Sequence, residues 1–412
     1  MGWWEQTVRQ FSGNPNFAFP YWDWTAQPSV PDAFWDGVLD PGNSAFYSSF
    51  GALQADFTQA MTAFYTGLSP AQQQQLTYRG LDTATAFWTQ AKIDLFGKRS
   101  LTQQNPGLPN PFVVSLETIN SALDTPYFAG GQSQVLGGFG SDYAAQHSDI
   151  TSKGILESLP HDNIHNDVGG FMGAFLSPID PVFAVHHANI DRLWTVWDGM
   201  QQIRRLRTRP WSQGDVWYDE PFVFFTDSTG SAVMLNTAGA YSEIGSFNYI
   251  YTQGSPLDMA SSAMTATMPT EGRRVTGTIR SAEMNFARPA VSRITVPIAQ
   301  HVRAHITIEE PADPGAIRFH VLVNPPQNAV TIEATHPSYA GTIQFFGRMA
   351  NHRHPQTFTV PLENALERLR RANALPGGHE VILEIQVVPQ ARGIALRAMP
   401  AVHVRKIEVS WF

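Results

Sequence analysis

The chain has 412 residues, of which 43% are hydrophobic and 15% charged, with a formal net charge of -8. A length above the usual limit of a single core predicts two domains, and the negative charge argues against a nucleic-acid partner. The absence of cysteine excludes disulfides, thiolate metal sites and thiol nucleophiles. With no apolar run long enough for a membrane span and no visible signal peptide, we expect a soluble chain whose location the sequence does not indicate.

The first half of the chain reads as helices separated by loops rich in Pro, Gly and Asn. We expect helices over residues 3–11, 69–96 and 111–123, the first ending at the turn Gly13-Asn14-Pro15. The clearest helical pattern runs from Pro178 to Met200, where apolar and histidine side chains recur along one stripe.

From about Val275 the pattern changes to short runs of β-branched residues, which are typical of strands. One helical interruption is expected around residues 362–372. The expected strands cover residues 275–279, 293–297, 304–308, 317–323, 329–334, 341–346, 357–360, 381–388 and 402–409. This pattern predicts an all-β sandwich. We therefore expect an N-terminal helical domain over 1–254, a linker over 255–274 and a C-terminal domain over 275–412.

Histidine is concentrated in one part of the chain. All 13 histidines lie at or after position 147, and none occurs in the first 146 residues. His161 and His165 are four residues apart, which on a helix places their side chains on one face at about 5–6 Å. His187, on the next predicted helix, completes a possible set of three imidazole ligands. This spacing alone leaves a structural or solvated pair open, but Asp162 in place of Glu disfavours a zinc-protease motif.

The whole string around these histidines is more specific than their spacing. It reads Pro160-His161-x-x-x-His165, a Gly169-Gly170 turn, then Ser177-Pro178-x-Asp180-Pro181-x-Phe183-x-x-His186-His187-x-Asn189-x-Asp191-Arg192-x-Trp194. It resembles the second copper-binding motif of the type-3 copper proteins, which are tyrosinases, catechol oxidases and molluscan haemocyanins. The resemblance implies that His161, His165 and His187 bind copper, whereas His186 is a neighbour that does not. The segment Pro20–Thr25 resembles the family's structural signature after its first copper-binding helix.

The resemblance implies a mainly α-helical type-3 copper domain in an oxidoreductase of the tyrosinase or polyphenol oxidase kind. Such enzymes use two copper ions and dioxygen to oxidise o-diphenols to o-quinones, and some also hydroxylate monophenols as monooxygenases. A phenolic small molecule and dioxygen are therefore the expected partners. The second domain resembles, more loosely, the β-sandwich that follows the catalytic domain in plant-type polyphenol oxidases, and it is expected to shield the active site.

The resemblance also assigns roles around the ligands. Glu157 is expected to hold a water that takes the phenol proton, and Asp162 replaces the Asn of many tyrosinases, so these two are the candidate catalytic residues. Asp191 is expected to orient a ligand imidazole, with Asn189 on the same helix beside it. Phe175 is expected to narrow the substrate entrance. The respective alternatives are a solvated carboxylate at 157, a surface ion pair at 191 and a core side chain at 175.

The ligands of the family's first copper ion are not visible in this sequence. Residues 3–9 resemble the end of the helix that carries the last of them, so the domain is expected to be N-terminally incomplete and inactive by itself. It supplies ligands for one copper. The alternatives are a non-catalytic or mononuclear copper-binding protein and a haemocyanin-like dioxygen-binding module. His301 and His305 lie in strand-like sequence, about 13 Å apart, and are expected to be surface residues.

Overall fold

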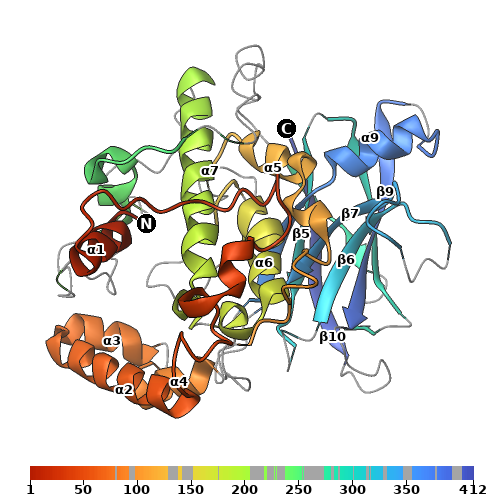
Figure 1. Cartoon of the computed structure of the whole chain (residues 1–412). Helices are drawn as coiled ribbons and strands as arrows, with labels where there is room; N and C mark the ends of the chain where they lie inside the picture. The colour runs from red at the N-terminus through yellow and green to blue at the C-terminus, as the bar shows by residue number, and fades with distance from the viewer. Residues whose placement is uncertain are drawn as a thin grey trace.

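The chain folds into a helical half followed by a β-half, which lie beside each other in Figure 1. The structure is a computed structural model. It describes residues 1–78, 81–91, 98–128, 138–141, 152–174, 176–204, 218–219, 227, 229, 237–252, 254, 273–279, 283–285, 288–299, 301–311, 315, 317–327, 332–346, 355–375, 378–391 and 401–412. The expected linker lies almost wholly outside these residues, so the domain boundaries stay a prediction.

The helices of the first half follow the predicted pattern with two differences. They are α1 (Gly2–Ser12), α2 (Phe50–Gly67), α3 (Pro70–Tyr78), α4 (Ala84–Ala91), α5 (Leu116–Leu123), α6 (Asp162–Val168) and α7 (Val182–Arg204). The expected helix over 69–96 is two helices, because the Thr83 hydroxyl accepts a hydrogen bond from the amide of Ala86 and caps a new start. Helix α2 was not predicted. Its apolar residues recur at spacings of three and four, at Phe50, Leu53, Phe57, Met61 and Phe64, but only Leu53 is fully buried.

The β-half consists of two antiparallel sheets, which confirms the predicted fold class of a helical domain followed by a β-domain. One sheet has the order β1-β10-β5-β8, with β3 also paired to β10, and the other has the order β2-β4-β9-β6-β7. The elements are β1 (Arg273–Thr276), β2 (Thr278–Ile279), β3 (Glu283–Met284), β4 (Ala290–Pro297), β5 (Val302–Ile308), β6 (Ile317–Val323), β7 (Tyr339–Gln344), β8 (Gln356–Pro361), α9 (Glu363–Arg371), β9 (Glu380–Ala391) and β10 (Val402–Trp411).

Two histidines of the β-half are buried, and the expectation that they lie on the surface is wrong. His301 is 4% exposed and His305 is 0% exposed. Strand β5 lies inside its sheet between β10 and β8, and nearly all of its residues are buried. The ring of His305 bonds with the hydroxyls of Thr359 and Ser410 on these two neighbouring strands. Because β5 is covered on both faces, the ring of His305 finds its partners inside the sheet. His301 lies just before the strand and stacks on the ring of Phe412.

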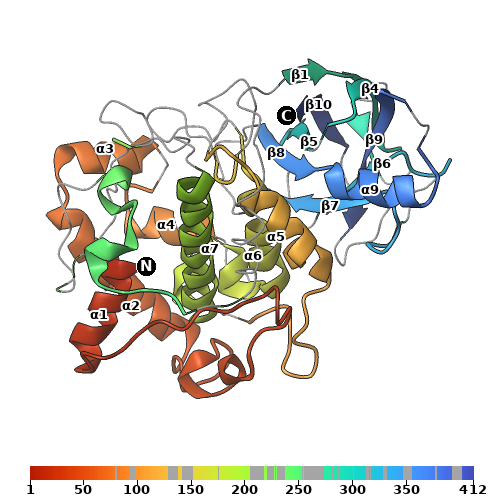
Figure 2. The ribbon, with the colours of Figure 1, turned by 90° about the horizontal axis from the view of Figure 1, so that it is seen from above.

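The outer strand of each sheet contacts the same segment of the helical half. The outer strand β7 contacts α6 and the π-helical turn η6 (Glu157–His161) that precedes it, and the outer strand β8 contacts η6. The side-chain amide of Asn163 donates to the carbonyl of Thr342 at 2.8 Å, and the hydroxyl of Ser158 accepts from the amide of Thr359 at 3.0 Å. Helix α6 accordingly lies between α7 and the β-half in both Figure 1 and Figure 2. These bonds satisfy backbone polar groups of the two outer strands and connect the two halves of the chain.

Within the described part of the chain, no helix has the length and apolar character that a membrane crossing requires.

Candidate metal centre

Four histidines converge where α6 meets α7. Each of His161, His165, His186 and His187 offers a ring nitrogen, and these nitrogens all lie within 4.8 Å of one another. Among the described residues this is the single cluster of His, Asp and Glu side chains with the spacing of a metal site. The structure therefore brings together the three predicted copper ligands and the neighbouring His186.

Local structure fixes the direction of both helices. Pro160 has no amide hydrogen to donate, and the chain takes a π-helical turn over Glu157–His161 before continuing as α6. At the start of α7, one oxygen of Asp180 accepts from the amide of Val182 at 2.9 Å. Asp180 is in turn held by Arg99 through two hydrogen bonds of 2.9 and 2.7 Å, and both side chains are buried. The two helices that carry the predicted ligands are thus anchored at their first turns.

Hydrogen bonds at Nδ1 set the tautomers of two of the predicted ligands. Nδ1 of His165 lies 2.7 Å from the carbonyl oxygen of Met172, and Nδ1 of His161 lies 2.9 Å from Oδ1 of Asp162. A carbonyl and a carboxylate can only accept, so both Nδ1 atoms carry the proton. With the proton on Nδ1, Nε2 of a neutral imidazole is the atom left with a lone pair, which is the state that a metal ion binds.

His187 completes the set from α7. Its Nε2 atom lies 3.1 Å from Nε2 of His165. Two nitrogens that bind one ion at about 2.0 Å each can be no more than about 4 Å apart, so this separation fits a shared ion. Burial, with the nearby charge of His161, lowers the pKa of both His165 and His187 well below the ordinary value. The rings stay neutral at physiological pH, as ligation requires.

His186 has the opposite tautomer. The indole Nε1 of Trp24 lies 2.9 Å from Nδ1 of His186, and an indole N–H can only donate. Nδ1 of His186 therefore accepts, and in the neutral ring the proton sits on Nε2, which has no hydrogen-bond partner among the described residues. A protonated nitrogen has no lone pair for a metal. The contact favours His187 over His186 as the third ligand. It also shows that Trp24, in the segment expected to be structural, fixes the tautomer of His186.

A buried charge pair lies behind His161. Asp162 is 0% exposed, and its second oxygen, Oδ2, lies 2.5 Å from Nζ of Lys153. Burial opposes both charges, but each group shifts the pKa of the other toward the ion pair, raising that of Lys153 and lowering that of Asp162. Glu157 also faces this lysine at 3.7 Å, is 23% exposed and accepts from the hydroxyl of Ser141. Sequence reasoning proposed the two carboxylates but missed Lys153, whose partners are set by folding.

The comparisons with known proteins agree with this geometry. Residues 1–200 match the family model described as the common central domain of tyrosinase. The helical half of this chain belongs to the tyrosinase family. Tyrosinase HcTyr1 of Hahella sp. is 37% identical over 114 residues, covering 27% of this chain and 22% of that protein. The chloroplastic polyphenol oxidase II of Ipomoea batatas is 25% identical over 249 residues, covering 57% of this chain and 34% of that protein. The match thus spans about a third or less of these relatives' lengths.

Two solved structures share the fold of the whole chain. A latent aurone synthase, itself a polyphenol oxidase, superposes with a TM-score of 0.58 at 18% identity, covering 99% of this chain and 73% of that one. The latent apple tyrosinase superposes with a TM-score of 0.54 at 17% identity, covering 100% of this chain and 81% of that one. The tyrosinase domain and the β-domain therefore occur together, in this order, in proteins of known structure.

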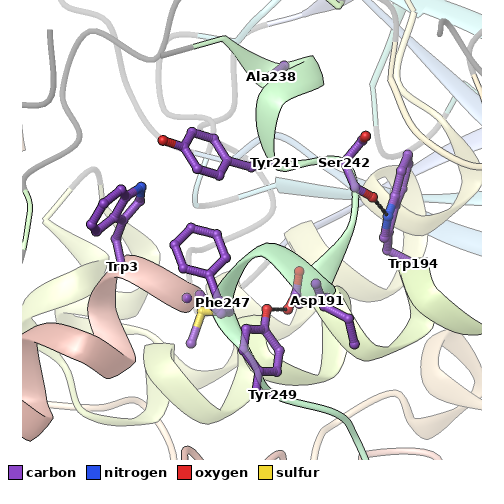
Figure 3. A pocket seen from close by; sticks show the side chains of 11 residues that line it. Trp3, Asp191, Trp194, Ala238, Tyr241, Ser242, Phe247 and Tyr249 are labelled. Carbon is purple, nitrogen blue, oxygen red and sulfur yellow. Dashed lines mark hydrogen bonds between the residues drawn. The ribbon is translucent and has the colours of Figure 1, made fainter. Parts of the chain in front are cut away.

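Asp191 has a different role in the tyrosinase domain from the one expected. One of its oxygens accepts hydrogen bonds from the hydroxyls of Tyr249 at 2.5 Å and Tyr251 at 2.6 Å. Figure 3 shows Asp191 with Tyr249 in an aromatic-lined cavity of about 190 Å³. Among the described contacts, its bonds go to these tyrosines and not to a ligand imidazole, which corrects the expectation. Burial raises the pKa of both tyrosines and keeps them as donors.

Asn189 and Phe175 are the two remaining residues for which the sequence predicted a role near the ligands. The side-chain oxygen of Asn189 accepts from Nε of Arg192 at 2.8 Å, so this residue holds an arginine rather than a ligand ring. That arginine lies over the ring of Tyr21 at 4.4 Å, in the expected structural segment. Phe175 lies outside the described residues, and its expected place at the substrate entrance stays a prediction.

Two other aromatic rings enclose the histidines. Phe183 of α7 stacks on His187 with ring centres 3.8 Å apart and an angle of 19°. Phe346, which follows β7 in the β-domain, lies with its ring centre 4.3 Å from that of His165 and 5.7 Å from that of His161. Sequence reasoning did not single out Phe346, because its contact joins positions about 180 residues apart. The β-domain therefore reaches the predicted metal site with a side chain.

Proposed function

We propose that this chain binds copper through Nε2 of His161, His165 and His187 and acts as the second copper half of a polyphenol oxidase. The observation that supports this most is the pair of Nδ1 hydrogen bonds, to Asp162 and to Met172, which leaves two lone pairs on the side facing His187. Three neutral imidazoles form a donor set that suits copper.

The proposed reaction is the oxidation of an o-diphenol to an o-quinone with dioxygen. Each diphenol loses two electrons and two protons, and one dioxygen takes up four electrons to form two waters, so two diphenols are oxidised per dioxygen. Bound copper supplies the redox chemistry. The protein's residues hold the ligands in one tautomer, exclude water with the rings of Phe183 and Phe346, and in the case of Glu157 are proposed to hold the water that takes the phenol proton. Hydroxylation of monophenols stays a prediction that rests on the same carboxylates.

A mononuclear copper-binding protein is the second candidate function. It is favoured by the distribution of histidine, since none occurs before His147 and the described residues offer one clustered set. Oxidation of the family type uses two copper ions, and these residues supply ligands for one. Both candidates therefore share the same first step, which is binding of one copper ion per chain at the three histidines.

Copper titration separates these possibilities. The purified chain is titrated with Cu(II), and bound metal is measured by mass spectrometry and calorimetry. We expect one tight site, weakened in His187→Ala by roughly 10²–10³-fold, since about 10–16 kcal/mol for a four-ligand site is about 2.5–4 kcal/mol per ligand. His186→Ala is the matched control, because this neighbouring imidazole presents a protonated nitrogen. Equal affinity of wild type and His187→Ala would refute the ligand assignment.

Catechol oxidation, followed by dioxygen uptake, then decides between the two functions. Turnover that is lost in His187→Ala supports the polyphenol oxidase. One bound copper without turnover supports copper binding alone as the function of these residues by themselves, which is also the result expected of one half of a two-copper site. Two tightly bound coppers per chain would contradict the proposal that these residues supply ligands for one ion.

A further inference from the structure

We infer that Lys153 is a positioning residue of the proposed copper site, acting through Asp162 on the ligand His161 and held in place by the β-domain. This inference rests on the proposed function, because it assumes that His161 binds the metal. Lys153 lies outside the sequence motifs described above, so the sequence did not predict this role.

The two oxygens of Asp162 have separate partners. Oδ1 lies 2.9 Å from Nδ1 of His161, and Oδ2 lies 2.5 Å from Nζ of Lys153. A carboxylate bound at both oxygens cannot rotate without breaking one of the bonds. The lysine therefore fixes the plane of the carboxylate, and the carboxylate fixes the orientation of the imidazole.

Charge balance explains why the lysine is needed. Lys153 is 4% exposed on its side chain and Asp162 is wholly buried, so neither charge is solvated by water. A buried carboxylate without a partner is strongly unfavourable, and so is a buried ammonium group. Together they form a pair without net charge, which presents an acceptor oxygen to His161. Glu157, 3.7 Å from the same ammonium group and partly exposed, is the other acidic group that faces it among the described contacts.

The β-domain holds Lys153 against this carboxylate. The amide of Lys153 donates to the carbonyl of Thr357 at 2.7 Å, and its backbone forms a parallel bridge with Phe358 of β8. The ammonium group also lies 5.3 Å from the centre of the Phe358 ring, within range of a cation–π interaction. The β-domain therefore supports the orientation of a ligand in addition to placing Phe346 beside the cluster. A merely structural ion pair would stabilise the fold without affecting the metal.

A double-mutant cycle on the full chain tests this role. The variants are Lys153→Met, Asp162→Asn and the double variant, and the measurements are Cu(II) affinity and the Cu(II) EPR spectrum. We expect Lys153→Met to weaken binding by about 10- to 100-fold and to change the spectrum, as loss of an outer-shell partner does. Asp162→Asn should also bind weakly, because it leaves the buried Lys153 with only the partly exposed Glu157, 3.7 Å away, as a counter-charge. The double variant keeps an amide oxygen for Nδ1 of His161 and removes both charges, so it should bind more tightly than either single variant.

Lys406→Met is the matched control, since Lys406 pairs with Glu408 in the β-domain at 2.8 Å and is half exposed. It should leave affinity and spectrum unchanged. Thermal unfolding of each variant shows whether it folds, and if Lys153→Met does not, the comparison of Asp162→Asn with the double variant decides.

Any of three results overturns the inference. The first is a Lys153→Met variant with wild-type affinity and spectrum. The second is losses of Cu(II) binding free energy that simply add in the double variant, and the third is a double variant that binds copper no better than Asp162→Asn. If wild type binds copper and His187→Ala does not, any of these results removes the role of Lys153 and leaves the proposed site intact. If wild type binds no copper, the proposed site and this inference fail together.

Discussion

The ring of Phe346 offers a direct test of whether the β-domain shields the histidines. It contacts two of them, with ring centres 4.3 Å from His165 and 5.7 Å from His161. Aromatic ring pairs contribute about 0.5–1.5 kcal/mol each, so Phe346→Ala should lower the free energy needed to uncover the site by about 1–3 kcal/mol. Since 1.36 kcal/mol is a factor of ten in rate, access to the site should become roughly 5- to 150-fold faster.

The assay measures this access with bound copper. The copper-loaded chain is mixed with a strong chelator in excess, and transfer of the metal is followed by stopped-flow absorbance. Phe112→Ala is the matched control, because Phe112 makes a similar edge-to-face contact with Tyr339 of the β-domain at 5.0 Å but does not touch the histidines. If Phe346→Ala releases copper at the wild-type rate, or if both variants accelerate release equally, the shielding role of this ring is refuted.

Two further predictions concern stability. Arg99→Met leaves Asp180 buried without its two charged hydrogen bonds, and should lower the free energy of unfolding by about 3–5 kcal/mol in urea titrations; a loss below about 1 kcal/mol would contradict the anchoring of α7. Burial, with the charges of Arg303 and Arg274, lowers the pKa of His305 from 6.5 to about 3. The unfolded chain therefore binds this proton first, and stability falls as the pH drops from about 6.5 toward 3, by up to about 1.4 kcal/mol per pH unit. His305→Gln should flatten this dependence in unfolding curves between pH 4 and 7, and an unchanged slope would show that another group is responsible.

Patterns that are local in the sequence predicted their structures well. The spacing of His161 and His165 and the motif around His187 indicated side chains that the structure brings into one cluster, since helix geometry relates residues three or four apart directly. The β-branched runs likewise marked most strands of the β-domain to within a few residues, because alternation along a strand reflects burial on its faces. The sequence alone thus determined the fold class, the family resemblance and the expected ligands.

Tertiary structure decided which group holds each of these side chains. Asp191 lies one helical turn from His187, yet its bonds go to tyrosines 58 and 60 residues away. The carboxylate that contacts the ring of a proposed ligand is instead Asp162, and its counter-charge is Lys153. Phe346 reaches the cluster from the other domain. A buried polar group takes whichever partner the packing places beside it, and that partner can come from any part of the chain, so periodicity and spacing carry no information about it.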